Sequence, residues 1–245
     1  MRYARSLSAV TPDPATRFVE MLDVLEAMYG PPRPLPTSDP LELVLWENIA
    51  YLQNDQRRQQ AFGALVEQVG TRPEQLLAAE RALLVRITRI GGIHAELRAE
   101  RLQEIARIVL EEFDGDVASA LRQPLPKARR LLTKFPAIGP PGAEKILLLT
   151  RSHPVLALES NGLRVLLRLG YGEEKKSYAA TYRSVQSAAA SAAGVDFDLL
   201  IRAHLLLRRH GQELCKNNSP RCEECPLAVH CAYDRRQRAG KSLRR

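Results

Sequence analysis

Four cysteines lie close together near the C-terminus of this 245-residue chain, and they are its only cysteines. Cys215, Cys222, Cys225 and Cys231 have the spacing C-x6-C-x2-C-x5-C. Four thiolates in one short segment suit either a tetrahedral zinc ion or a [4Fe-4S] cluster. In a reducing compartment such a group favours metal ligation over disulfides. The segment therefore predicts a metal centre.

A second stretch with chemical potential runs from Lys134 to Arg164. It contains the residues FPAIGPPG at positions 135 to 142, a pattern that ends one helix and begins another within a few residues. We interpret it as a helix-hairpin-helix. Glycines let a backbone approach a phosphate, and the N-terminus of the second helix directs N-H groups and a positive dipole end toward it. Gly139 and Gly142, with Ile138 before them, are placed for this role; an ordinary helical connection is the alternative.

The same stretch ends in Glu159-Ser160-Asn161, directly after the apolar residues 155 to 158. We interpret Glu159 as a reactive carboxylate, with a helix N-cap or a surface acid as the alternative. A phosphate-binding hairpin holds a duplex in position without reading its sequence. The excess of 36 Lys and Arg over 28 Asp and Glu also favours an anionic partner such as nucleic acid.

The elements that carry these residues are expected to be helices, because almost no segment alternates as a strand does. Amphipathic patterns predict helices at about 14–29, 41–52, 55–70, 72–79, 80–90, 96–114, 117–121, 128–134, 163–169, 177–193 and 198–211. In the helix at 41–52, Leu41, Val44, Leu45, Ile49 and Leu52 share one face, and Glu47 lies toward its edge. Asp39 is expected to cap this helix, with Pro40 at its first position.

No apolar run approaches the roughly 20 residues that cross a bilayer, and the N-terminus lacks the apolar core of a signal peptide. We therefore expect an intracellular, cytoplasmic protein that acts on bacterial nucleoid DNA. We also expect it to be a monomer.

With the hairpin and the cysteine segment together, the chain resembles the endonuclease III and adenine DNA glycosylase superfamily over about residues 14 to 233. The resemblance implies an all-α fold with a six-helix barrel at 39–153 and a helical iron-sulfur domain formed by 15–36 and 154–233. Residues 1–14 are expected to be flexible and residues 234–245 to form a solvated basic tail. The resemblance also favours a [4Fe-4S] cluster at the four cysteines, with zinc as the minor alternative.

The resemblance implies that the protein flips a damaged or mispaired base out of duplex DNA and cuts its N-glycosidic bond. Bifunctional members of the family have a lysine at the start of the second hairpin helix, which attacks the sugar and later cleaves the strand. Pro141 occupies that position here. Lys145, one turn further along, is expected to be solvated or to face a phosphate. The resemblance therefore predicts a monofunctional glycosylase.

The family's catalytic aspartate aligns with Glu159, which would stabilise positive charge on the sugar or orient the attacking water. Asn161 agrees better with the adenine glycosylase branch than with the endonuclease III branch. Glu47 falls where adenine glycosylases have their catalytic glutamate, and partial burial would suit it to protonate a leaving base. An edge glutamate paired with an arginine is the alternative for Glu47.

Two further residues are expected near DNA. Gln53 is the nearest candidate to fill the gap left by a flipped base, and His94 lies in a Gly-rich loop that would approach the duplex. Two other functions remain open. One is an endonuclease III-like enzyme that nicks abasic sites with an unexpected amine, and the other is a DNA-binding relative that has lost catalysis.

Overall fold

The computed structural model describes residues 13–242. Within these residues there is no strand, and the only β-type pairing is an isolated bridge between Tyr51 and Gly92. The all-α fold expected from the sequence is therefore confirmed. The chain divides into two compact units, one formed by Arg33–Glu159 and the other by the described residues up to Pro32 together with those from Ser160 onward.

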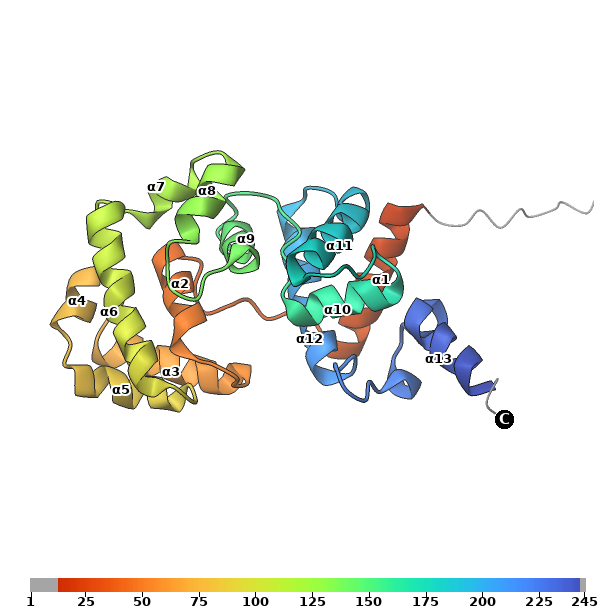
Figure 1. Cartoon of the computed structure of the whole chain (residues 1–245), viewed down its shortest axis with the longest axis horizontal. Helices are drawn as coiled ribbons and strands as arrows, with labels where there is room; N and C mark the ends of the chain where they lie inside the picture. The colour runs from red at the N-terminus through yellow and green to blue at the C-terminus, as the bar shows by residue number, and fades with distance from the viewer. Residues whose placement is uncertain (1–12, 243–245) are drawn as a thin grey trace, which may run out of the picture. The chain divides into compact units, whose positions relative to one another are not determined.

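The unit Arg33–Glu159 is built around one central helix, α2. Asp39 caps it by accepting a hydrogen bond from the Glu42 N-H at 2.9 Å, and Pro40 is its first residue, as predicted. Figure 1 shows α2 among α3, α6, α7 and α9, which all pack against it. The helices of this unit are α2 Pro40–Ile49, α3 Asp55–Gln68, α4 Pro73–Ala78, α5 Arg81–Ile90, α6 Ala95–Glu112, α7 Val117–Leu121, α8 Leu125–Leu132 and α9 Pro140–Leu149.

Helix α2 ends at Ile49, three residues before the end predicted from the sequence. Ala50 is extended, and the Tyr51 N-H donates to the Gly91 carbonyl at 3.0 Å. This pairing replaces the helical hydrogen bonds that residues 50 to 52 would otherwise make. Leu52, predicted on the apolar face, is instead 76% exposed with a φ of 55°.

A buried arginine, Arg98 of α6, holds this irregular region together. Its Nη1 donates to the carbonyls of Ile49 and Gly91 at 2.8 and 2.7 Å. Its Nη2 donates to the carbonyls of Thr88 and Gly92 at 2.8 and 2.6 Å. One planar guanidinium thus binds backbone carbonyls at the end of α2, in the last turn of α5 and in the loop that follows α5.

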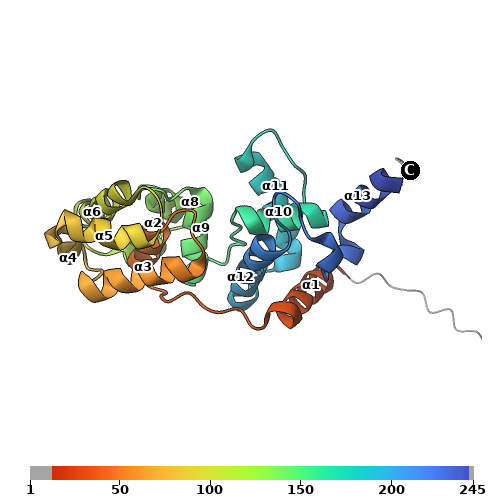
Figure 2. The ribbon, with the colours of Figure 1, turned by 90° about the horizontal axis from the view of Figure 1, so that it is seen from below.

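The second unit contains α1 Pro14–Tyr29, α10 Ser160–Leu169, α11 Tyr178–Ala193, α12 Phe197–Glu213 and α13 Ala232–Ser242. Helix α12 packs against α10 and α1, and the views in Figure 2 and Figure 1 agree on this. The packing of α10 on α12 is close at Gly211, where an added Cβ would come within 2.7 Å of the Asn161 backbone and side chain. Only a glycine allows this approach.

The described part of the predicted basic tail at 234–245 belongs to α13. The start of this helix is fixed because the Arg168 guanidinium lies 4.5 Å from the centroid of the Tyr233 ring and Asp234 is buried. Its later residues, including Arg235 and Arg236, are exposed, as a basic surface requires. Residues 243–245, and residues 1–12 of the predicted flexible N-terminus, lie outside the described part.

Among the helices of the described residues, none has the length and apolar character needed to span a membrane.

Candidate functional site

The predicted helix-hairpin-helix is formed by α8 and α9. Helix α8 spans Leu125–Leu132, so it begins three residues earlier and ends two residues earlier than the helix predicted at 128–134. Gly139 is the N-cap residue of α9, and no side chain caps this end. Pro140 and Pro141 have no backbone N-H, so Gly142 provides the first N-H group of α9 that a ligand could bind. Gly139 has an ordinary φ of −86°, and Cβ atoms added at Gly139 or Gly142 would find no neighbour closer than 3.9 and 3.6 Å. The fold itself does not require glycine at either position.

The hairpin turn is anchored to α2 by Asn48, a buried residue that sequence reasoning missed. Its Nδ2 donates to the Pro136 carbonyl at 2.9 Å and to the Val44 carbonyl at 3.0 Å. Ala137, the next residue of the turn, has a left-handed φ of 61°. An amide side chain within an otherwise apolar helix was the signal that could have identified this contact, because buried polar groups normally have hydrogen-bond partners.

A buried ion pair fastens the two hairpin helices to each other. Glu144 of α9 is buried, and its Oε1 lies 2.5 Å from Nη2 of Arg129 in α8. Phe135, in the turn after α8, stacks on Phe113 with ring centroids 5.1 Å apart. The turn is therefore held in one shape from both sides, which preorganises the N-terminus of α9.

Glu47 of α2 is paired with cations from two other helices. Its Oε2 lies 2.5 Å from Nζ of Lys145 in α9, and its Oε1 lies 3.9 Å from Nη1 of Arg58 in α3. Lys145 is therefore not the solvated or phosphate-facing lysine expected from its sequence position. The alternative in which Glu47 pairs with an arginine holds in part, although the shorter contact is with the lysine.

Glu159 directly precedes α10, and its side chain is partly exposed. Asn161, in the first turn of that helix, accepts a hydrogen bond at its Oδ1 from Nη2 of Arg164 at 2.8 Å. The same nitrogen of Arg164 also donates to the Gly211 carbonyl at 2.8 Å. Asn161 therefore lies in a network with α12.

Residues 51 to 53 and 92 to 94 form two adjacent loops joined by the Tyr51–Gly92 bridge. The Gln53 side chain is packed so closely on Gly92 that a Cβ there would lie 2.7 Å from its Cγ. His94 adopts a left-handed φ of 59° before α6, and its ring lies 6.2 Å from that of Tyr51. Tyr51, Leu52 and Ile93 are exposed, as is His94, whereas Gln53 is partly buried. The apolar tip of the two loops is thus formed by residues that sequence reasoning did not select.

All four cysteines line one pocket between α10, α12 and the C-terminal loop, together with Arg168 and His210. Nη1 of Arg168 lies 3.3 Å from Sγ of Cys215, and Nε2 of His210 lies 3.5 Å from Sγ of Cys225. Burial, with a smaller contribution from the other three thiols, raises the pKa of Cys225 to about 11. Deprotonated thiols in this pocket therefore require a compensating positive charge, as a metal centre supplies.

No group of three or more metal-binding side chains in residues 13–242 is close enough together to hold a single ion. A zinc ion would draw four sulfurs to about 2.3 Å from one point. A four-iron cluster binds each thiolate at a different iron and so keeps the sulfurs further apart. The four thiolates could therefore hold either centre.

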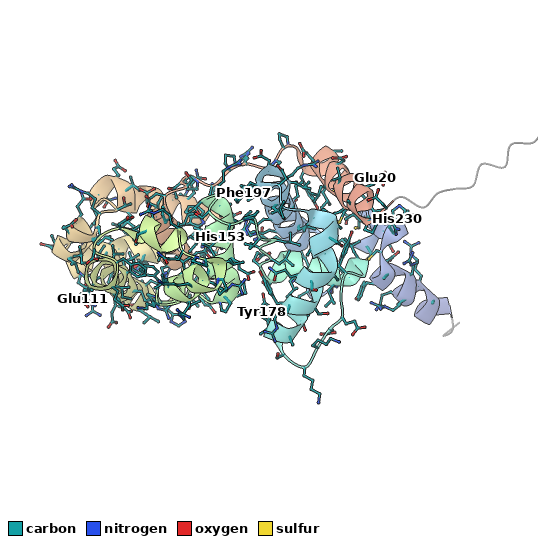
Figure 3. The ribbon with its side chains drawn as sticks, turned by 90° about the horizontal axis from the view of Figure 1, so that it is seen from above. Glu20, Glu111, His153, Tyr178, Phe197 and His230 are labelled. Atoms are coloured by element: carbon teal, nitrogen blue, oxygen red, sulfur yellow. The ribbon has the colours of Figure 1, made fainter. Side chains whose placement is uncertain are left out.

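The histidines were expected to have core or surface roles. His210 is buried, and its Nδ1 lies 2.9 Å from the Tyr29 hydroxyl. His153, labelled in Figure 3, lies after α9 with its Nε2 3.1 and 3.0 Å from the carbonyls of Leu121 and Gln123. These contacts explain both residues as structural.

Comparison with known proteins gives consistent relatives, although no protein-family model matches the chain. It is 27% identical to endonuclease III of Thermotoga maritima over 210 residues, which are 86% of this chain and 91% of that protein. A solved complex of endonuclease III with DNA has a TM-score of 0.72 at 20% identity, covering 92% of this chain and 98% of that one. A thermostable thymine-DNA glycosylase has a TM-score of 0.69 at 17% identity, covering 91% and 97%.

Proposed function

The chain belongs to the endonuclease III and helix-hairpin-helix glycosylase superfamily, and from this premise we propose that it is a DNA glycosylase that removes a damaged or mispaired base. Its partner is duplex DNA, which it binds as a monomer. Hydrolysis of the N-glycosidic bond is the proposed reaction. The observation that carries this proposal is Pro141 in the first turn of α9, because proline has no amine with which to attack the sugar.

The open space beside Gly139 and Gly142 in the hairpin supports the proposal that this turn binds DNA. Since nothing within the protein requires glycine at 139 or 142, the absence of side chains is best explained by the close approach of a phosphate. Ile138 is buried beneath the turn and supports it from within, which gives it a structural role rather than a contact with DNA. Asn161 of α10 remains a proposed DNA contact, positioned by Arg164.

Glu159 is the proposed catalytic carboxylate. It lies at the end of an apolar segment and next to a helix N-terminus, and its carboxylate would stabilise the positive charge that develops on the sugar. Base release from a panel of damaged duplexes tests the proposal. Glu159→Gln should abolish release, and Glu159→Asp, which restores the family's residue, should retain it. Base release that persists in Glu159→Gln would remove this residue from the mechanism.

Two alternatives make different predictions in the same assay. An enzyme with residual lyase activity would be trapped on abasic DNA by sodium borohydride, whereas the hydrolytic enzyme gives no adduct. A relative that only binds DNA would reduce the electrophoretic mobility of the duplex in a gel but would release no base from any duplex of the panel. The pairing of Lys145 with Glu47 favours the hydrolytic enzyme, because a charged, hydrogen-bonded ammonium is a poor nucleophile.

We propose that the tip formed by Tyr51, Leu52 and Ile93 fills the gap left by a flipped base, with Gln53 behind it. Exposed apolar side chains on a rigid loop suit insertion between bases. Gln53 is the weaker candidate because its side chain is packed on Gly92. His94 is placed to fix the loop and to contact the backbone of the duplex.

Cys215, Cys222, Cys225 and Cys231 are proposed to hold a [4Fe-4S] cluster. Bound there, the cluster would join the C-terminal loop to α10 and α12 and so contribute to folding. Purified protein should show broad visible absorption and about four irons per chain. A colourless protein that contains one zinc would favour the alternative.

A further inference from the structure

Glu47 forms ion pairs with side chains from two other helices, one of which is distant in the sequence. The carboxylate comes from α2, the Lys145 ammonium from α9 and the Arg58 guanidinium from α3. The side chain of Glu47 is only 18% exposed and those of Lys145 and Arg58 are 17% exposed. The group is therefore largely removed from water, where ion pairing is stronger than at an open surface.

The position of Lys145 on α9 relates it to the hairpin. It lies four residues after Pro141, and residues four apart share one face of a helix. The separation along the axis is about 6 Å. The ammonium group is thus one turn from the position at which bifunctional relatives have their lysine, but it is directed to a carboxylate.

The surrounding charges indicate which form of Glu47 the fold stabilises. Protonation of Glu47 would leave Lys145 and Arg58 as two half-buried cations with no negative charge between them. Arg98 of α6 is the next positive group, and its pKa is lowered by burial and by the nearby Arg58. Glu144, the neighbouring acid on α9, is already paired with Arg129. An excess of positive charge around Glu47 therefore favours its ionised form.

We propose that Lys145 is a positioning residue that holds Glu47 as a fixed anion, so that Glu47 contributes negative charge to base removal and does not donate a proton. This inference rests on the proposed glycosylase function. The anion can stabilise the sugar cation or accept a proton from the attacking water. The ion pair also directs the Lys145 amine to a carboxylate, so we do not expect this amine, one turn from Pro141, to restore lyase chemistry.

The test compares Lys145→Met, which removes the charge, with Lys145→Arg, which retains it. Lys175→Met is the matched control, because Lys175 forms an exposed pair with Glu173 and the change in net charge is the same. The carboxyl carbon of Glu47 is followed by NMR in 13C-glutamate protein and assigned with Glu47→Gln. We expect it to titrate at higher pH in Lys145→Met than in the wild type, and to be unchanged in Lys145→Arg and in the control.

Single-turnover base release provides the second readout. Lys145→Met should be slower by roughly tenfold or more, since a displaced catalytic group loses its geometry. Its rate should also begin to fall at higher pH than the wild-type rate as the solution is acidified. If Glu47 were the proton donor, removal of Lys145 would instead extend activity to higher pH, and that result would overturn the proposal.

Other outcomes separate this inference from the function on which it rests. Identical titration of Glu47 in wild type and Lys145→Met would overturn the inference even if base is released. A borohydride adduct that disappears in Lys145→Met would also overturn it, since Lys145 would then be the nucleophile. If the titration shifts as expected but no duplex releases a base, the proposed function fails, while the effect of Lys145 on Glu47 stands.

Discussion

Arg164 of α10 donates a hydrogen bond from Nε to the backbone carbonyl of Cys215 at 2.8 Å. Because Arg164 also binds Asn161, one side chain connects the first turn of α10 with the first residue of the cysteine loop. The proposed metal centre and Asn161, a proposed DNA contact, thus share a support. Disturbance of the loop should reach the start of α10 through this contact.

Arg164→Met should lower the free energy of unfolding by about 2–4 kcal/mol, because it removes the hydrogen bonds that Arg164 donates to the carbonyls of Gly211 and Cys215 and to the Asn161 amide oxygen. Urea denaturation measures the change, and iron analysis of the same preparation should show reduced occupancy. Arg235→Met removes an exposed arginine of the same unit and should change stability by less than about 0.5 kcal/mol. Equal midpoints for the two variants would contradict the proposed support.

Arg98→Lys should destabilise the protein by about 3 kcal/mol, although the charge is retained. A lysine ammonium cannot reach the four carbonyls of residues 49, 88, 91 and 92 that the planar guanidinium now binds. Thermal denaturation measures the loss, and hydrogen exchange should be faster in residues 91–94. Arg89→Lys, in an exposed pair with Glu96, is the control and should be nearly neutral. A tolerated Arg98→Lys would show that the loops do not depend on this side chain.

Gly139→Ala and Gly142→Ala should weaken duplex binding roughly tenfold or more without loss of stability, because the added methyl groups meet a phosphate and not the protein. Titration of a labelled duplex at fixed salt concentration measures the affinity. The matched control is Gly63→Ala in α3, where an added Cβ also finds open space. It should stabilise the helix by about 1 kcal/mol and leave affinity unchanged. Full affinity in both hairpin variants would remove them from the interface.

Local patterns were sufficient to predict the hairpin, the cysteine segment and most helices, because turns and amphipathic faces are encoded within a few neighbouring residues. The pairing of Glu47 with Lys145 could not be predicted, since it joins residues about a hundred positions apart on helices whose rotation depends on the packed core. The position of Leu52 was also predicted incorrectly because it depends on a contact with residues far away in the sequence. Its spacing suits the apolar face of α2, but the bridge between Tyr51 and Gly92 ends the helix before Leu52 is reached.

Leu52→Ser and Ile93→Ser should reduce base excision roughly tenfold with less than about 0.5 kcal/mol change in stability, because these exposed side chains make few contacts within the protein. A duplex containing 2-aminopurine beside the target base should show less fluorescence increase on binding. Leu110→Ser, another exposed leucine of the same unit, is the control. If the tip variants excise bases at the wild-type rate, the gap is filled by another residue, and Gln53 would be the next candidate.

Ala137→Gly should stabilise the protein by roughly 1 kcal/mol, because Ala137 has a φ of 61°, a left-handed conformation that costs an L-residue about 1–2 kcal/mol. The gain is reduced by the greater freedom of glycine in the unfolded chain. Ala188→Gly, at an exposed position inside α11, is the same chemical change and should destabilise by about 1 kcal/mol. If urea denaturation gives changes of opposite sign in the free energy of unfolding for the two variants, the strain is local to the hairpin turn.

DNA affinity should be unchanged by Ala137→Gly, since Asn48 holds the Pro136 carbonyl in place whichever residue follows it. A loss of affinity would instead show that the alanine restricts the turn to its binding conformation, and that the strain is maintained for function.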